Sequence, residues 1–238
     1  MLFPGTAGVW YSRDPSGPAA RDDPVTEFDP NCRRCPRLAS FLAEGRARHP
    51  DYHCAPVAPF GDPQPSLLVV GLAPGFHGAN ATGRPFTGDY AGVLLYETLH
   101  ACGWTSAPVS VARNDGLRLV GCRVSNAVKC VPPANRPTPG EIATCNGFLR
   151  AELAGLPRDA VVLALGAIAH GAVLRAVGAR QATFRFAHGA EHVLPDGRVL
   201  VDSYHCSRYN TNTRRLTEEM FRAVVGRVSE LARQADRG

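Results

Sequence analysis

The sequence predicts an α/β domain built around a mainly parallel sheet. Four short apolar runs, the first of which ends in Gly and Pro, fit strands that are buried on both faces. Segments with helical periodicity alternate with these runs, and such alternation is typical of strand–helix–strand units. The predicted strands are residues 66–72, 123–128, 160–165 and 198–202. Hydrophobic residues make up 45% of the 238 residues, which is enough for a sizeable core.

The segments around these runs predict five helices. Residues 32–49 and 90–100 carry apolar side chains at helical spacing. Thr138 and Glu141 form the Thr-x-x-Glu pattern of a capping box, which predicts a helix that begins there and continues to Leu153. The other two helices are predicted at 167–177 and 217–231, with a hairpin at 184–193.

Composition argues against a secreted or membrane-spanning chain. There is no run of about 18 apolar residues, and the N-terminus lacks the basic and apolar regions of a signal peptide. We therefore expect a cytoplasmic protein, without a membrane partner, whose cysteines are reduced. Residues 1–30 are rich in Pro, Asp and Arg without periodicity, and we expect them to form an extended arm on a single domain of residues 31–238.

The charge is compatible with a polyanionic partner but does not demand one. The formal net charge is +5, and the 26 Lys and Arg residues are almost all Arg, the residue best suited to phosphate. A genome of high GC content produces the same bias. Charge alone therefore does not decide the function.

Four of the eight cysteines form two distant pairs that predict a metal centre. These are Cys32-Arg-Arg-Cys35 and Cys130-(x14)-Cys145. Four thiolates can hold structural zinc or a [4Fe–4S] cluster. The wide second spacing is unlike a paired zinc knuckle and favours the iron–sulfur cluster, while zinc and unliganded thiols remain alternatives. The other four cysteines, at positions 54, 102, 122 and 206, are expected to be small buried hydrophobes.

Three predicted strands end at residues with ligand-binding chemistry. Gly71, Asn126 and His205 each lie at or just after the carboxyl end of a strand. Ligands of open α/β sheets bind at that edge, so these three segments are expected to meet at one crevice. The Gly/Pro-rich segment 71–89 contains neither a P-loop nor a GxGxxG motif, and by itself it is equally typical of an ordinary loop.

Four motifs follow one another along the chain. They are Gly-Leu-Ala-Pro-Gly, Thr-Gly-Arg-Pro-Phe-Thr-Gly-Asp, Ser-Asn-Ala-Val-Lys-Cys-Val-Pro-Pro and Ser-Tyr-His. Together they resemble the iron–sulfur uracil-DNA glycosylases, in the family's order and over roughly residues 30–230. Ala73 stands where family 4 carries an acidic residue, and the Arg-rich insertion of covalently trapping relatives is missing, so family 5 (type b) is the more similar branch. Ala81, where the family often has Arg or Lys, and Cys206, where it usually has Pro, depart from the pattern.

The resemblance implies a fold, an activity and a set of partners. The fold is a three-layer α/β/α sandwich with a central, mainly parallel four-stranded sheet. The activity is that of a monofunctional DNA-repair glycosylase that excises uracil and other deaminated or damaged bases from DNA, with a [4Fe–4S] cluster as cofactor. A bacterial or archaeal monomer acting on damaged DNA is expected.

A glycosylase must hold an extrahelical base in a snug pocket. Phe86 can supply the stacking face, and the Asn126 amide can accept uracil N3–H while it donates to O4. The backbone amides near Ala73 and Gly75 are expected to close on the base edge. An aromatic in the core and an Asn that fixes a turn are the simpler interpretations, and only the motif context argues against them.

Three polar residues are candidates for the chemistry. His205 is expected to donate a hydrogen bond to uracil O2 as negative charge develops on the departing base. Because Ala73 cannot act as a base, Asn80 or Asp89 is expected to position the water, although Asp89 can equally cap the helix that begins near Tyr90.

The segment after His205 is polar, basic and aromatic, as expected of a DNA-contacting loop. Ser207, Arg208 and Arg214, together with Arg84 from the second motif, are the expected neighbours of DNA phosphates. A solvated loop before the last helix is the alternative. Two other function classes also stay open, namely a non-catalytic iron–sulfur redox protein and a zinc-stapled nucleic-acid-binding module. No lyase activity is expected, because Lys129 is the only lysine within these motifs.

Overall fold

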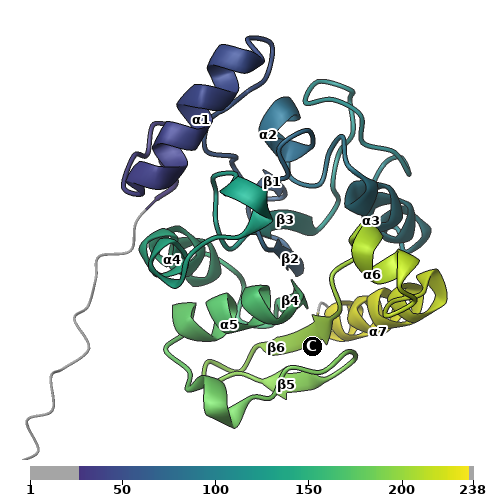
Figure 1. Ribbon diagram of the computed structural model, residues 1–238. Helices are drawn as coiled ribbons and strands as arrows, with labels where there is room; N and C mark the ends of the chain where they lie inside the picture. Colours follow the sequence, from purple (N-terminus) through teal and green to yellow (C-terminus); the bar gives the residue numbers. More distant parts are fainter. Residues whose placement is uncertain (1–26, 236–238) are drawn as a thin grey trace, which may run out of the picture.

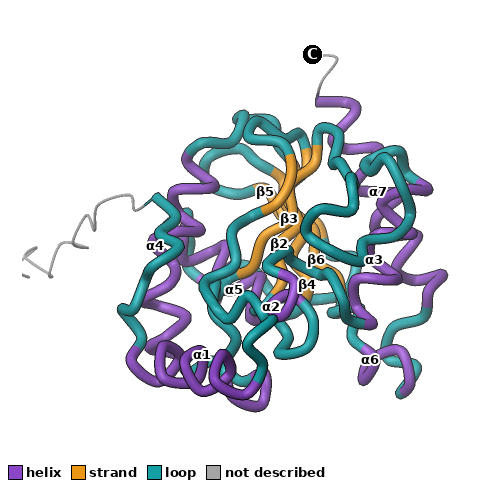
Figure 2. The backbone as a smooth tube through the Cα atoms, turned by 90° about the horizontal axis from the view of Figure 1, so that it is seen from above, coloured by secondary structure: helices purple, strands orange, loops and turns teal. Residues whose placement is uncertain are grey.

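The protein is a three-layer α/β/α sandwich around a six-stranded sheet. The structure is a computed structural model that describes residues 27–235. The strand order is β1-β3-β2-β4-β6-β5. The sheet lies between a helical layer that contains α4 and α5 and another that contains α3 and α7 (Figures 1 and 2). This confirms the predicted fold class. Most of the expected arm at 1–30 lies outside the described residues.

The four predicted strands form the parallel centre of the sheet. They are β3 (Cys122–Asn126), β2 (Leu67–Gly71), β4 (Val161–Leu165) and β6 (Val199–Ser203). The expectation of four strands was too low, because β1 (Phe60–Gly61) and β5 (Glu191–Val193) add antiparallel edges. Two- and three-residue strands carry too little alternation to be recognised in the sequence.

Five long helices follow the predicted pattern, and two short ones do not. The long helices are α1 (Pro36–Arg48), α3 (Tyr90–Ala101), α4 (Pro139–Ala154), α5 (Ala167–Ala176) and α7 (Glu218–Ala235). The predicted capping box opens α4, since the Thr138 and Glu141 side chains each accept from the other's backbone amide. The short helices α2 (Ala79–Thr82) and α6 (Arg208–Asn212) are single turns without a periodic signal. Short 3₁₀ helices occupy Pro133–Asn135 and Gln181–Thr183.

The sheet is buried on both faces by alternate side chains of its strands. Leu67 and Val69 pack with α3 and α7 on one face, while Leu68 and Val70 pack with α4 and α5 on the other. Such burial explains why the strands read as continuous apolar runs rather than alternating ones. A third apolar cluster joins α1 to the segment after β3 and to α4. None of the described helices is long and apolar enough to cross a membrane.

Strand register brings the predicted ligand-binding residues to one edge. Gly71 is paired with Asn126 across β2 and β3, and Leu165 is paired with Ser203 across β4 and β6. His205 follows Ser203 after one intervening residue. The carboxyl ends of all four parallel strands therefore border one crevice, as predicted.

Candidate active site

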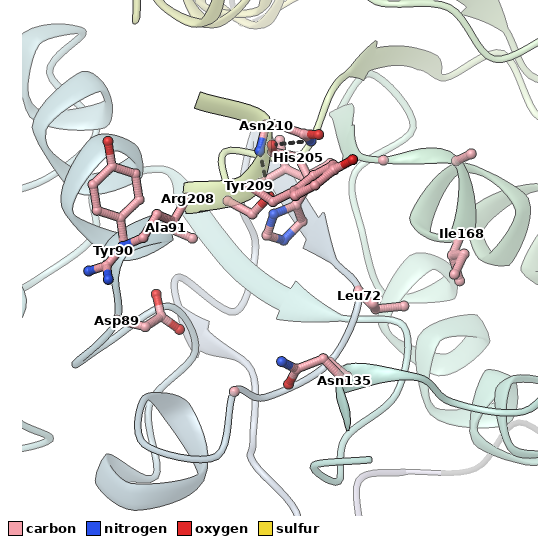
Figure 3. Close-up of a pocket in the computed structure, with 16 residues that line it drawn as sticks. Leu72, Asp89, Tyr90, Ala91, Asn135, Ile168, His205, Arg208, Tyr209 and Asn210 are labelled. Carbon is pink, nitrogen blue, oxygen red and sulfur yellow. Dashed lines mark hydrogen bonds between the residues drawn. The ribbon is translucent and has the colours of Figure 1, made fainter. Parts of the chain in front are cut away.

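Two adjoining cavities occupy this edge of the sheet. The inner one measures about 30 Å³ and is lined by Ala73, Gly75, Ala79, Phe86, Asp89, Ala91, Asn126 and His205. The outer one measures about 530 Å³ and shares Ala73, Gly75, Asp89, Ala91 and His205 with it. Figure 3 shows Asp89, Asn135 and His205 enclosing the outer cavity from three separate segments. All the residues expected to bind a base, together with two of the three expected to be catalytic, therefore meet at one place.

Asn126 is a buried amide with one unused acceptor. Its side chain is 3% exposed, and its Oδ1 has no hydrogen-bond partner among the described residues. A Cβ atom at Gly71 would lie 2.5 Å from this Oδ1 and 2.5 Å from the Phe86 ring. Position 71 therefore requires glycine, because any side chain would displace the amide or the ring. A buried acceptor without a partner is costly. Asn126 also lines the inner cavity, so its acceptor is open to a ligand that donates a hydrogen bond.

Phe86 forms one wall of the inner cavity in a strained conformation. Its φ is 53°, which is unusual for a bulky residue, and strain of this kind clusters at functional sites. The Phe86 and His205 rings are nearly parallel, with centroids 5.8 Å apart and an interplanar angle of 23°. The two rings thus present flat faces at the mouth of the inner cavity.

His205 is a neutral imidazole at physiological pH. The ring is partly accessible through the cavities, yet protein surrounds it, and this loss of solvation lowers its pKa to about 4. The loop that carries it is held by Asn210, whose Nδ2 donates to the His205 carbonyl over 2.8 Å. A neutral imidazole has one N–H donor to offer a ligand.

Asp89 caps a helix and faces the cavities at the same time. Its Oδ1 accepts from the Gly92 amide over 2.9 Å at the start of α3. Its Oδ2 lies beside Gly75 and Gly78, where a Cβ atom would approach it to 3.4 and 2.5 Å. Burial raises the pKa of this carboxyl group, against the hydrogen bonds of the first helical turn. The capping and catalytic interpretations are therefore compatible.

Asn80 does not lie in either cavity. Its side chain is completely buried, and its Nδ2 donates to the Phe76 carbonyl and to Cys54 Sγ over 3.3 and 3.5 Å. The expectation that Asn80 positions water is therefore not supported. Asn80 instead holds the loop beneath the site.

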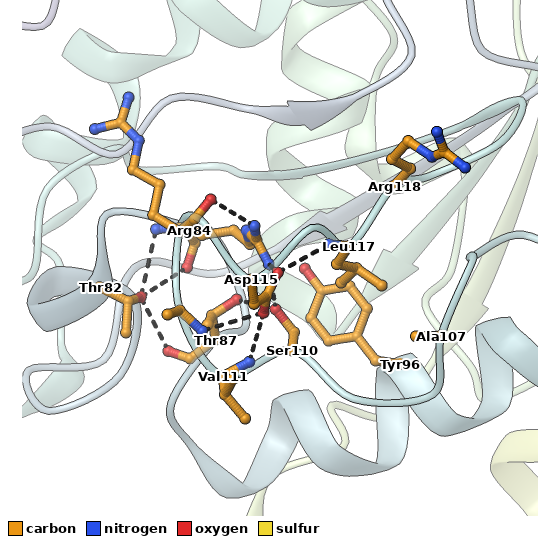
Figure 4. Close-up of polar contacts among 12 residues, drawn as sticks. Thr82, Arg84, Thr87, Tyr96, Ala107, Ser110, Val111, Asp115, Leu117 and Arg118 are labelled. Atoms are coloured by element: carbon orange, nitrogen blue, oxygen red, sulfur yellow. Dashed lines mark hydrogen bonds and ion pairs between the residues drawn. The ribbon is translucent and has the colours of Figure 1, made fainter.

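The Arg84 side chain is buried and binds the 110–115 loop instead of facing solvent. Its side chain is 4% exposed and forms a 2.7 Å ion pair with Asp115. It also donates to Ser110 Oγ and the Arg113 carbonyl over 2.9 and 2.6 Å, as Figure 4 shows in part, and it stacks on Phe60. Burial opposes ionisation of Asp115, but hydrogen bonds from the Leu117 amide and from Arg84 hold the pKa of its carboxyl group below the usual range. The expected phosphate contact at Arg84 is thus wrong for this structure.

The three other expected DNA contacts lie on or near α6. Ser207 caps α6, and both Ser207 and Arg208 line the outer cavity. The Arg208 guanidinium lies 5.2 Å from the centre of the Tyr90 ring. Arg214 is exposed but does not line the cavity. The sequence reasoning had not singled out Tyr209, which is 72% exposed at the rim, although exposed aromatics in a basic loop are a usable signal.

The four paired cysteines converge behind the site. Cys32, Cys35, Cys130 and Cys145 line one small cavity together with Leu38, Lys129 and Phe148. Burial and the neighbouring sulfurs raise the pKa of Cys130 to about 12. Free thiolates would be unfavourable there without a bound cation. No three of these sulfurs lie within 4.8 Å of one another, as judged over the described part of the chain.

One other group of possible metal ligands is better explained by hydrogen bonds. His170 Nδ1 and His192 Nε2 donate to the two oxygens of the fully buried Asp202 over 2.8 and 3.0 Å. His170 Nε2 donates to the Phe184 carbonyl over 3.1 Å. Both carboxylate oxygens are already used, so this group ties the 184–193 segment to β6. The hairpin expected at 184–193 is instead formed by β5 and β6, with its turn at 194–198.

The fold and site together define an α/β protein in which an amide, an aromatic ring, a neutral imidazole and a carboxylate border one small cavity at the carboxyl ends of the parallel strands. The family model of the uracil DNA glycosylase superfamily matches residues 58–228. The chain belongs to that superfamily. It is 48% identical over 206 residues to the type-5 uracil-DNA glycosylase of Thermus thermophilus, covering 84% of this chain and 94% of the relative.

Two further relatives distinguish the branches. The type-5 uracil-DNA glycosylase of Pyrobaculum aerophilum is 43% identical over 203 residues, covering 84% of this chain and 88% of the relative. The type-4 uracil-DNA glycosylase of Thermotoga maritima is 41% identical over only 104 residues, covering 43% and 46%. The resemblance to the type-5 branch is thereby confirmed.

Proposed function

We propose that this protein is a monofunctional DNA-repair glycosylase that takes uracil out of DNA and hydrolyses its N-glycosidic bond. The unpaired Asn126 Oδ1 in the cavity beside Phe86 carries the proposal. Uracil N3–H matches this acceptor, and uracil O4 matches the amide NH2, whereas cytosine presents the opposite pattern at both atoms. The Phe86 ring supplies the face on which the base stacks.

Bond cleavage leaves negative charge on the departing base. The neutral His205 donates its N–H to uracil O2, and this hydrogen bond strengthens as the charge develops. Ala73 and Gly75 border both cavities, so their backbone amides are placed to close on the base edge. The water that attacks the sugar is positioned by Asp89, the carboxylate that borders both cavities.

The rim of the outer cavity binds the DNA strand. Arg208 and Ser207 are next to phosphates, with Tyr90 and Tyr209 offering faces for neighbouring bases. Arg214 adds a second exposed cation near the end of α6. The protein acts in this way as a monomer, in the cytoplasm of a bacterium or archaeon.

The four converging cysteines hold a [4Fe–4S] cluster. One tetrahedral zinc with bonds of about 2.3 Å needs sulfurs only about 3.8 Å apart, and the wider arrangement suits a larger group. When bound, the cluster crosslinks α1, the segment after β3 and α4, and takes no part in the reaction. We expect brown protein with iron and sulfide, and a poorly soluble Cys130→Ala variant. Stoichiometric zinc without iron in protein purified anaerobically would contradict this assignment.

The activity is tested on a labelled oligonucleotide that contains one uracil. We expect free uracil and an abasic product that alkali cleaves, with no strand cleavage before alkali. The same strand with cytosine is the substrate control, and Asn126→Ala is the protein control. Binding without uracil release would favour the non-catalytic alternatives, which membership of the superfamily does not favour.

A further inference from the structure

Lys129 is an exceptional residue in this chain. It is the only lysine among 26 Lys and Arg residues. It is also one of the largest fully buried side chains of the described residues, with 1% of its surface exposed. A buried ammonium is costly unless each of its donors finds an acceptor. The acceptors around Nζ therefore indicate the structural role of this charge.

All three ammonium protons of Lys129 have an acceptor. Lys129 Nζ donates to the Asn126 carbonyl over 2.8 Å, to Ser125 Oγ over 2.6 Å and to Glu152 Oε1 over 2.5 Å. Two of these acceptors belong to the last residues of β3, and the third belongs to α4. The ammonium thus anchors the end of β3 to a helix behind the sheet.

The three acceptors explain why this position holds lysine in a chain that otherwise uses arginine. An ammonium is compact and directs three donors tetrahedrally, whereas a guanidinium is flat and places its donors in a rigid fork. Arginine could not direct donors to three acceptors that surround a single nitrogen. Lysine therefore matches the arrangement of the three acceptors around Nζ.

The backbone of Lys129 connects the end of β3 to the cavity that the four paired cysteines line. Its amide donates to Cys145 Sγ over 3.2 Å, and its neighbour Cys130 lines that cavity. On the other side, the Ala127 amide donates to the Gly71 carbonyl over 2.9 Å. Residues 126–130 thus run directly from the inner cavity to the cysteines.

We propose that Lys129 is a positioning residue for base recognition, whose ammonium holds the main chain of Asn126 so that its amide points into the inner cavity. This inference rests on the proposed function. Lys129 itself lines neither active-site cavity and touches no base. Its effect on excision therefore passes through Asn126.

A double-mutant cycle on single-turnover uracil excision tests this. Lys129→Met/Glu152→Gln removes the ammonium and neutralises its carboxylate together, so no buried charge is left unpaired. We expect the pair of changes to slow excision by about tenfold to a hundredfold when Asn126 is present. In an Asn126→Ala background the same changes should cost less than about twofold, because the amide to be positioned is gone.

Three controls separate positioning from folding. The melting temperature and the visible absorption report the fold and the cluster. Affinity for DNA with an abasic-site analogue, which has no base to read, should stay within about twofold of the wild type. Glu152→Gln alone keeps the bond to the Asn126 carbonyl and should lose less activity than the pair. If the pair does not fold, Lys129→Arg replaces it in the cycle, because it keeps a positive charge opposite Glu152.

Equal losses with and without Asn126, or no loss at all, would overturn the proposal. A parallel loss of affinity for the abasic analogue would also overturn it, since that defect does not involve the base. A wild-type protein that releases no uracil would instead contradict the proposed function. The wild-type assay therefore tests the proposed function, and the double-mutant cycle tests the role of Lys129 independently.

Discussion

At the scale of single residues, the proposed function makes Asn126 the residue that selects the base. We expect Asn126→Asp to slow uracil excision and to shift preference toward cytosine, because a carboxylate accepts from the cytosine N4–H2 but cannot donate to uracil O4. Loss of one paired polar contact costs about 1–3 kcal/mol. Rates on uracil and cytosine oligonucleotides measure the shift. Asn80→Ala is the matched control, since that buried amide should affect stability and not base choice. Wild-type rates in Asn126→Ala would contradict the assignment.

His205 carries the largest single catalytic effect we expect. Removal of a donor to a developing oxyanion costs on the order of 10²–10³ in rate, so His205→Ala should slow excision more than Asp89→Ala or Asn80→Ala. Because burial lowers the pKa of His205 to about 4, its ring should stay neutral from pH 8 to about pH 5. Nitrogen chemical shifts of the imidazole check this directly. A titration midpoint near 6.5, or an Asp89→Ala variant that loses activity while His205→Ala keeps it, would reverse our assignment of roles.

Two arginines show how the element around a side chain decides what it does. Arg208 lies on α6 at the cavity rim, whereas Arg84 joins the second motif to the 110–117 loop. We expect Arg208→Ala to reduce the salt dependence of DNA binding by about one unit of slope. Arg84→Ala should leave that slope unchanged and cost about 1–3 kcal/mol of stability, because Asp115 loses its side-chain partner but keeps three backbone donors. Binding titrations at several salt concentrations and chemical denaturation separate the two outcomes.

The contacts of His170 with Asp202 and with the Phe184 carbonyl should make stability depend on pH. Burial opposes the charge on His170, but the hydrogen bond to Asp202, the negative charge of Asp202 and the hydrogen bond to the Phe184 carbonyl together raise the His170 pKa above its usual value. A raised folded-state pKa stabilises the fold fully below the unfolded pKa of about 6.5, and this contribution is lost as pH rises through the folded-state value. The gap in melting temperature between the wild type and His170→Gln should therefore shrink from pH 6 to pH 9. A gap that grows over this range would show that His170 is neutral.

The sequence predicts the large features of the whole molecule better than its local contacts. Continuous apolar runs located the four parallel strands, and strand ends predicted the meeting of Gly71, Asn126 and His205, because parallel strands share one edge. Asp89 was correctly predicted to cap a helix, and it also lines both cavities. Arg84 was assigned to DNA because nothing in a linear sequence shows that it pairs with Asp115, which is distant along the chain. Asn80 was expected in the site because the sequence does not show that its amide turns toward the Phe76 carbonyl and Cys54.

The order of the site along the chain bears on how the protein is made. Asn126 and all four cysteines precede β4, whereas His205 follows β6, the strand that adds to the far side of β4. During synthesis, all four paired cysteines therefore leave the ribosome well before His205 does. If the proposed cluster and site are right, a growing chain can bind its metal centre before it can cleave a glycosidic bond. It becomes able to catalyse the reaction only after the last parallel strand has been made.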